Sequence, residues 1–143
     1  MQRILCLDIG EKRIGLAVSD PLGITAQPID YILNTGKKNV CERIKELVSE
    51  YNIGKIVAGI PYNLKGEKTE STERAEKLLD FLKKNIENVD FDSIDERLST
   101  AQAQNLLIEA DVRRNKRKEK IDKLAASLIL QNYLSIKQCK SEG

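Results

Sequence analysis

Three acidic residues stand where predicted elements of this sequence begin or end. Asp8 lies at the end of an apolar run typical of a buried strand, and Glu96 directly follows a later predicted strand. Asp122 opens the last predicted helix. Each also has an ordinary structural interpretation. Asp8 could close a turn, Glu96 could be a surface acid paired with Arg97 or with a helix dipole, and Asp122 could be a first-turn helix acid.

Together the three carboxylates favour metal-dependent cleavage of a phosphodiester. Carboxylate oxygens bind Mg²⁺ or Mn²⁺, and two such ions about 3.5–4 Å apart can activate a water and stabilise the leaving oxygen. The sequence contains no histidine, which excludes Ser-His-Asp and Cys-His hydrolysis, histidine-ligated zinc and the histidine pair of metal-free ribonucleases. We therefore expect Asp8, Glu96 and Asp122 to be catalytic residues and also the ligands of two metal ions.

A basic tract directly precedes Asp122, with six lysines and arginines among the eight residues 113–120. Such a run is usually a solvated face or a mobile loop. Beside an anionic site, however, it can neutralise phosphates and hold a nucleic-acid strand over the metals. The residues expected to contact substrate in this tract are Arg113, Arg114, Lys116, Arg117 and Lys118.

Arg13 and Arg97 are two further candidates for substrate contact. Arg13 follows the turn after the first predicted strand, and Arg97 is next to Glu96. Either could equally form a surface ion pair of little energetic value. Aromatic residues make up only 4% of the chain, so we expect nucleic acid to be read through its backbone and shape.

The elements that must position these residues begin with three strands. Apolar runs over residues 4–9 and 14–18 predict two strands joined by a tight turn at Gly10, and residues 24–33 predict a third. Pro28 within the third segment predicts an edge strand or a bulged one. Their short connections predict that the three strands are antiparallel.

Helices and strands alternate in the rest of the sequence. Amphipathic patterns predict helices over residues 38–51 and 72–85, and apolar runs predict strands over 55–59 and 89–94. Ser99 or Thr100 is expected to cap a third helix, and a last helix is expected over 121–135. If strand 89–94 lay next to the first strand, it would bring Glu96 to the sheet edge where Asp8 lies.

Asp122 borders the apolar face of this last helix. The residues at helical spacing after it are Ala125, Ala126, Ile129 and Tyr133. The two alanines would let the helix approach the sheet closely. The whole order predicts an α/β fold with a mixed five-stranded sheet, in which three antiparallel strands precede two helix-connected strands and helices lie on the faces.

Composition sets the limits of the interpretation. The 143 residues suit a single domain over 1–143, with 137–143 expected to be a frayed tail. The 24 basic and 22 acidic residues nearly cancel, so net charge alone does not predict a nucleic-acid partner. Three widely spaced cysteines and no signal peptide indicate a reduced, cytoplasmic protein, and no apolar stretch predicts a membrane partner.

Four blocks of the sequence resemble the YqgF/RuvX family. They come in the family's order and span most of the chain: Leu7–Asp20, Val57–Pro61 with Gly66, Asp95–Thr100, and Asp122–Ala126 through Leu130 and Gln131. The resemblance implies a ribonuclease H-like fold with catalytic acids at Asp8, Glu96 and Asp122, and it favours Glu96 over Asp95. The family is described as a Holliday junction resolvase and as the nuclease that trims the 5′ end of the small-subunit ribosomal RNA precursor.

Several functional alternatives remain open at this level. RNA precursor and branched DNA place the same demands on the carboxylates, and we favour the precursor because nothing in the sequence specifies a symmetric dimer; monomer and homodimer both remain open. A non-catalytic nucleic-acid-binding ribosome-assembly factor would need only the basic tract. The sugar-kinase and actin-like ATPase fold also opens with Asp-x-Gly and a hairpin, but it needs two such domains, and 143 residues are too few.

Overall fold

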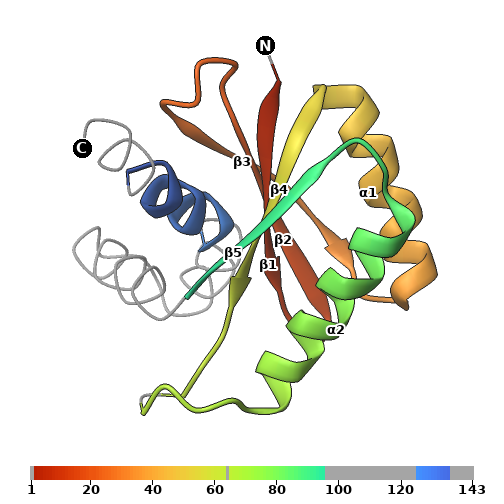
Figure 1. Cartoon of the computed structure of the whole chain (residues 1–143), viewed down its shortest axis with the longest axis vertical. Coiled ribbons are helices and arrows are strands. Elements are labelled where there is room, and N and C mark those ends of the chain that lie inside the picture. The colour runs from red at the N-terminus through yellow and green to blue at the C-terminus, as the bar shows by residue number, and fades with distance from the viewer. Residues whose placement is uncertain (1, 64, 96–124, 136–143) are drawn as a thin grey trace, which may run out of the picture.

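The computed structural model describes residues 2–63, 65–95 and 125–135, and these form a sheet between two layers of helix (Figure 1). A helix over residues 125–135, drawn in blue, forms one layer. The other elements are β1 (Arg3–Ile9), β2 (Arg13–Ser19), β3 (Ala26–Leu33), α1 (Lys37–Tyr51), β4 (Ile53–Ile60), α2 (Glu70–Asn85) and β5 (Asp90–Asp95). All five predicted strands and the helices predicted over 38–51 and 72–85 are confirmed within a few residues.

The five strands follow the order β3-β2-β1-β4-β5 across the sheet. β1 pairs antiparallel with β2, and β2 pairs antiparallel with β3, whereas β4 is parallel to both β1 and β5. The prediction for Pro28 is confirmed in both forms, because β3 is an edge strand and its register with β2 shifts between Gly15 and Ala17. The mixed sheet predicted from the sequence is therefore present.

The condition that strand 89–94 lies next to the first strand is wrong. β5 does not lie next to β1, because β4 separates the two strands. Two helix crossovers, β3–α1–β4 and β4–α2–β5, have their helices on the same face of the sheet (Figure 1). Because crossovers between parallel strands are almost always right-handed, each of them adds its new strand on the same side of β1. β1, β4 and β5 are nevertheless parallel, so their carboxyl ends reach the same edge of the sheet.

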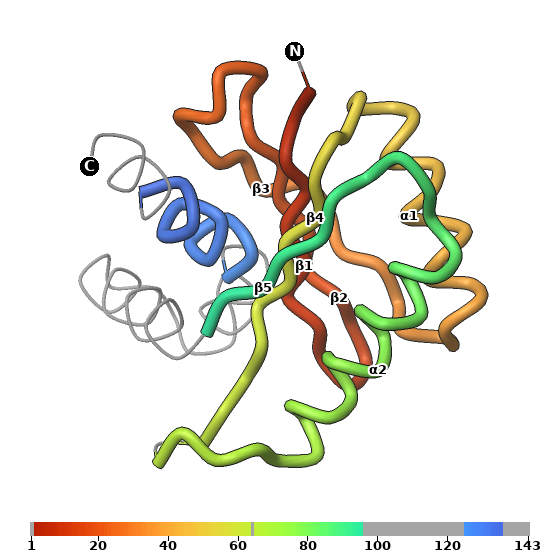
Figure 2. Tube along the Cα trace, viewed as in Figure 1, coloured from red at the N-terminus to blue at the C-terminus, as the bar shows by residue number. Residues whose placement is uncertain are grey.

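The two faces of the sheet carry separate apolar clusters. α1 and α2 cover one face, and the helix over 125–135 lies on the other (Figures 1 and 2). Leu5, Leu7 and Ile9 of β1 belong to the cluster under α1 and α2, while Cys6 belongs to the cluster under residues 125–135. The alternation of side chains along a strand thus divides β1 between two cores.

Helix α2 begins two residues before its predicted start. Thr69 is its N-cap: the Thr69 side chain accepts from the backbone N–H of Thr72, and the Thr72 side chain accepts from the backbone N–H of Thr69. This capping box used a threonine at the position where glutamate or glutamine is usual, which is why the sequence pattern did not reveal it.

Cys6 and Cys41 are buried, and neither forms a disulfide within the described residues. No helix within residues 2–63, 65–95 and 125–135 is long and apolar enough to cross a membrane. The single domain over 1–143, the helix capped by Ser99 or Thr100 and the frayed tail stay predictions, because they involve residues outside the described ranges.

Candidate active site at the carboxyl edge of the sheet

Asp8 is the next-to-last residue of β1, at the carboxyl edge that β1 shares with β4 and β5. Its neighbours Leu7 and Ile9 point into the α1/α2 core, so the Asp8 side chain points to the opposite face, on the side of residues 125–135. Asp8 is half-buried. The sheet therefore holds this carboxylate at the border of a core, where an acid has little reason to be unless it has a partner or a ligand.

Glycines stand opposite Asp8 on both neighbouring strands. Gly15 of β2 and Gly59 of β4 are its register partners, and both are buried. Directly paired residues project to the same face of a sheet, so neither register partner of Asp8 places a side chain beside the carboxylate. Ile94 of β5 continues the same row beyond Gly59.

The turn after Asp8 is closed by other residues. The Gly10 backbone N–H donates to the Arg13 carbonyl at 2.9 Å, and Asn34 Nδ2 donates to the Gly10 carbonyl at 2.9 Å. A Cβ added at Gly10 would lie 2.6 Å from the Arg13 carbonyl oxygen, so only glycine permits this close approach. The turn fixes Asp8 at its start and Arg13 at its end.

A pocket of about 440 Å³ lies at the carboxyl ends of β4 and β5, lined by Ile60, Tyr62, Gly66, Ser93, Ile94 and Asp95. Asp95 pairs with Ile60, a residue of the α1/α2 core, so Asp95 belongs to the row after that of Asp8. Ile94, by contrast, packs against the cluster under residues 125–135, on the Asp8 face. The pocket therefore borders the Asp8 row.

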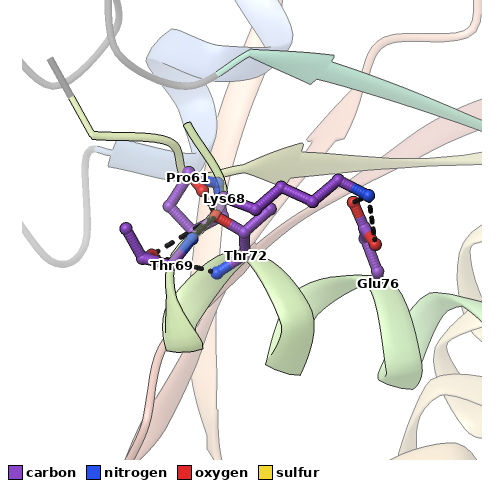
Figure 3. A network of polar contacts seen from close by, with 5 residues as sticks. All are labelled: Pro61, Lys68, Thr69, Thr72 and Glu76. Carbon is purple, nitrogen blue, oxygen red and sulfur yellow. Dashed lines mark hydrogen bonds and ion pairs between the residues drawn. The ribbon is translucent and has the colours of Figure 1, made fainter. Parts of the chain in front are cut away.

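The loop that forms one wall of this pocket is anchored to α2. The Thr72 hydroxyl, fully buried, donates to the Pro61 carbonyl, and Lys68 forms an ion pair with Glu76 at 3.1 Å (Figure 3). The Asn63 side chain accepts from the backbone N–H groups of Lys65 and Glu67, at 3.0 and 2.8 Å. These contacts hold the loop between β4 and α2 at the carboxyl edge.

A polar network joins the helix over 125–135 to the sheet. Lys55 Nζ donates to the Tyr133 hydroxyl at 3.0 Å, and that hydroxyl donates to Asp92 Oδ2 at 2.7 Å. Burial of the ring, followed by the hydrogen bond to Asp92, raises the pKa of Tyr133 well above its usual range. One buried tyrosine thus connects the strands β4 and β5. It lies near the last residue of the helix over 125–135, whose first turn was predicted to carry Asp122.

The predicted site residues fall into two groups. Asp8 is at the predicted strand end, and Arg13 is exposed at the start of β2. The others lie outside the described residues: Glu96, Arg97, Arg113, Arg114, Lys116, Arg117, Lys118 and Asp122. Within the described part of the chain, no group of three or more Asp, Glu or Cys side chains could hold a metal ion. The predicted ligand set is therefore represented there by Asp8.

Sequence reasoning missed the two glycines beside Asp8 and the Lys55–Tyr133–Asp92 network. Both depend on strand register, which joins residues far apart in the sequence. Gly15 and Gly59 each lie within an apolar run, where a glycine often marks a close approach of another backbone or a ligand. The sequence does not show that both glycines flank the same residue. The buried faces of the last helix were predicted correctly, since Ala125, Ala126, Ile129 and Tyr133 are all buried.

Comparison with known proteins places the chain in a family. Residues 2–136 match the family model described as "RuvX: Holliday junction resolvase". The chain belongs to the RuvX family. This confirms the family resemblance, whose four blocks all lie within the matched residues.

Curated relatives in the RuvX family carry the name "Putative pre-16S rRNA nuclease". One from Clostridioides difficile is 45% identical over 135 residues, which cover 94% of this chain and 95% of the relative. Another from Streptococcus thermophilus is 47% identical over 135 residues, which cover 92% of this chain and 96% of the relative. The similarity thus extends over nearly the full length of both proteins.

Solved structures confirm the ribonuclease H-like fold of this RuvX protein. RuvC of T. thermophilus, solved with a Holliday junction substrate, superposes with a TM-score of 0.58 at 12% identity over 96% of both chains. The fowlpox virus Holliday junction resolvase gives a TM-score of 0.54 at 19% identity, covering 94% of this chain and 99% of the viral one. At these identities the likeness concerns the fold alone.

Proposed function

We propose that this protein is a divalent-metal-dependent endonuclease that processes the 5′ end of the small-subunit ribosomal RNA precursor in the cytoplasm. The observation that carries the proposal is the relationship to RuvX proteins of 45–47% identity, named for pre-16S rRNA cleavage, over more than nine-tenths of the chain. The half-buried Asp8 at the carboxyl edge of the sheet supplies a position for the chemistry. A Holliday junction is the second candidate substrate, because the matching family model is described as a resolvase.

The donor chemistry fits Mg²⁺ or Mn²⁺. The chain has no histidine, and Asp8 offers hard carboxylate oxygens at a position where both register partners are glycines. Asp8, Glu96 and Asp122 would hold the metal, in our proposal two ions. Such ions supply charge neutralisation and water activation at a phosphodiester.

The assignment of Glu96 is supported by the position of its neighbours. Ile94 lies on the Asp8 face and Asp95 pairs with a residue of the opposite core. Asp95 therefore lies on the α1/α2 side of the sheet and not in the row of Asp8. We therefore propose Glu96 rather than Asp95 as the second catalytic acid, as the family resemblance also implies.

The protein groups divide the work in this scheme. Asp8 would hold the metal at the strand end, and the turn fixed by Gly10 sets the geometry between Asp8 and Arg13. Arg13 contacts the substrate backbone as a cation, and the basic residues of the 113–120 tract and Arg97 add further phosphate contacts. Substrate recognition is therefore mainly electrostatic.

The test compares cleavage of two labelled substrates in Mg²⁺ and in Mn²⁺: an RNA containing the 5′ end of the small-subunit rRNA precursor, and a four-way DNA junction. We expect cleavage of the precursor, lost in Asp8→Asn, Glu96→Gln and Asp122→Asn. Asp80→Asn, the same acid-to-amide change at an exposed position of α2, should cleave normally. Asp95→Asn should keep most of the activity.

Two results would contradict the proposal. Junction cleavage without precursor cleavage would favour the resolvase. Cleavage of neither substrate, with Glu96→Gln fully replacing the parent protein in cells, would indicate a non-catalytic assembly factor.

A further inference from the structure

Tyr31 lies in the same row of the sheet as Asp8. Asp8 pairs with Gly15 of β2, and Gly15 pairs in turn with Tyr31 of β3. Adjacent strands are about 4.8 Å apart, so Tyr31 is two strands, or about 10 Å, from Asp8. The residue between them is a glycine, which places no side chain in the row.

The Tyr31 side chain points to the Asp8 face. The preceding register pair, Ile14 and Ile32, packs into the α1/α2 core, so their sequence neighbours Gly15 and Tyr31 face the other way. Tyr31 is 37% exposed, and Leu33, two residues later on the same face, is 58% exposed. This corner of the sheet is therefore accessible beside the candidate active site.

Arg13 stacks on Tyr31. The guanidinium carbon of Arg13 lies 5.0 Å from the centroid of the Tyr31 ring, within the range of a cation–π interaction. Arg13 is two residues before Gly15, so it also belongs to the Asp8 face, and it is exposed. An arginine and an aromatic ring thus form a defined pair next to Asp8.

We propose that Arg13 and Tyr31 together form a binding site for the phosphate backbone of the substrate strand, in which Tyr31 positions Arg13. The proposal rests on the proposed nuclease function. It adds Tyr31, an aromatic residue, to a site for which the low aromatic content had predicted recognition of the backbone by charged groups alone. A rise of about 3.4 Å per nucleotide places the pair within about three nucleotides of the bond held at Asp8.

The geometry suits this division of roles. Stacking occupies the face of a guanidinium, whereas its five N–H donors lie in its plane and match the fork of a phosphate. A ring below the guanidinium reduces the freedom that would be lost when phosphate binds. Tyr31 therefore acts through Arg13, and it should contribute little where Arg13 is missing.

A double-mutant cycle on binding tests the proposal. The affinity of the full chain carrying Asp8→Asn, which separates binding from cleavage, is measured for the labelled rRNA precursor and the four-way junction across a range of salt concentrations. Arg13→Ala should weaken binding and reduce the magnitude of the salt slope by about one. Tyr31→Ala and Tyr31→Leu should weaken binding about two- to fivefold, while Tyr31→Phe, which keeps the ring, should bind like the parent.

The coupling is the decisive measurement. In the Arg13→Ala background, Tyr31→Ala should have almost no further effect. Equal losses from Tyr31→Ala with and without Arg13 would overturn the proposal, because the ring would then act on the nucleic acid directly. Unchanged binding by Tyr31→Ala would overturn it too.

A control and a second assay keep the interpretation separate from the nuclease function. Lys45→Ala removes an exposed cation from α1, on the far face of the sheet, and should leave the salt slope unchanged. Thermal unfolding verifies that each variant is folded, which the exposure of Tyr31 favours. If the protein with Asp8 intact binds but does not cleave, the nuclease function fails while this site stands. If the parent binds neither substrate, the site fails.

Discussion

The two faces of the sheet are built from different kinds of side chain. The face under α1 and α2 carries large aliphatic residues, including Leu5, Leu7 and Ile14, all without solvent exposure. On the opposite face the buried sheet residues are the smaller Cys6, Ala17 and Val57. The same face also carries Asp8, the Lys55–Tyr133–Asp92 network and the exposed pair Arg13 and Tyr31.

This difference separates stability from chemistry within single strands. Each fully buried leucine or isoleucine contributes roughly 1.5–3 kcal/mol of transfer free energy, so the α1/α2 face supplies most of the apolar stabilisation. Small residues on the other face let the helix over 125–135 approach the sheet and leave positions for polar groups. Leu7 and Asp8, adjacent in β1, represent the two faces.

The largest expected effect follows from Asp8→Asn. We expect the cleavage rate to fall by about three orders of magnitude, because metal-assisted catalysis contributes several kcal/mol and each 1.4 kcal/mol is tenfold in rate. The free energy of unfolding should be unchanged or higher, because one of several proposed neighbouring anions is lost. Single-turnover cleavage and urea denaturation measure the two quantities. A large loss of stability would mean that Asp8 is structural.

Leu7→Ala is the matched change on the other face. Truncation of this fully buried leucine should lower the free energy of unfolding by about 2–5 kcal/mol, through lost transfer energy and the cavity left behind. The cleavage rate per folded molecule should stay close to that of the parent. A specific loss of activity in the folded variant would show that the two faces are not independent.

Tyr133→Phe should have an intermediate effect. The ring and its packing remain, but Asp92 and Lys55 lose the hydroxyl between them, which should cost about 1–3 kcal/mol of stability in urea denaturation. Tyr51→Phe, on α1, is the control and should cost less. Equal costs would mean that the network contributes nothing specific.

The same tyrosine gives a pH dependence. Burial and the bond to Asp92 raise the pKa of Tyr133, so its stabilising contribution is present below the ordinary tyrosine pKa of about 10 and is lost as pH rises towards the folded value. Ultraviolet absorbance should show a tyrosine that keeps its proton well above the ordinary tyrosine pKa of about 10, and Tyr133→Phe should remove that late step.

The smallest effect is expected from Asp20, at the opposite edge of the sheet. Its Oδ1 accepts from the backbone N–H groups of Ile24 and Thr25 at 2.7 and 3.1 Å, which lowers the pKa of the carboxyl group. The contribution of Asp20 to the hairpin is therefore present above the ordinary aspartate pKa and is lost as pH falls through the folded value. Carboxyl titration by NMR should show the lowered pKa, and Asp20→Asn should change neither cleavage nor the core.

Local periodicity was enough to predict most of the fold. The apolar runs and helical spacing located the five strands of the described residues, the helices α1 and α2, and the buried positions of residues 125–135, because these depend only on neighbours in the sequence. The order of the strands was less accessible. The sequence contains no direct signal that β4 lies between β1 and β5, since that choice is made by packing over the whole sheet.

The candidate site was predicted only in part, because local sequence patterns show strand ends and turns but not which residues pair between strands. Asp8 could be identified from its strand end, and Arg13 from the turn that follows. The glycines on both sides of Asp8 and the stacking of Arg13 on Tyr31 required the register between strands, including a bulge in β3 that changes which residues share a face. Glu96 and Asp122 stay predictions, as they lie outside the described residues.

Pro28 and the bulge beside it have a consequence for solubility. An edge strand exposes a row of backbone groups on which a second chain can add a strand and begin to aggregate, and β3 adds exposed apolar residues such as Leu33. Proline lacks the N–H that such an added strand would need, and a shifted register interrupts the regular spacing of the remaining groups. Replacing Pro28 with valine would therefore leave the fold intact while making the protein more prone to precipitate at high concentration.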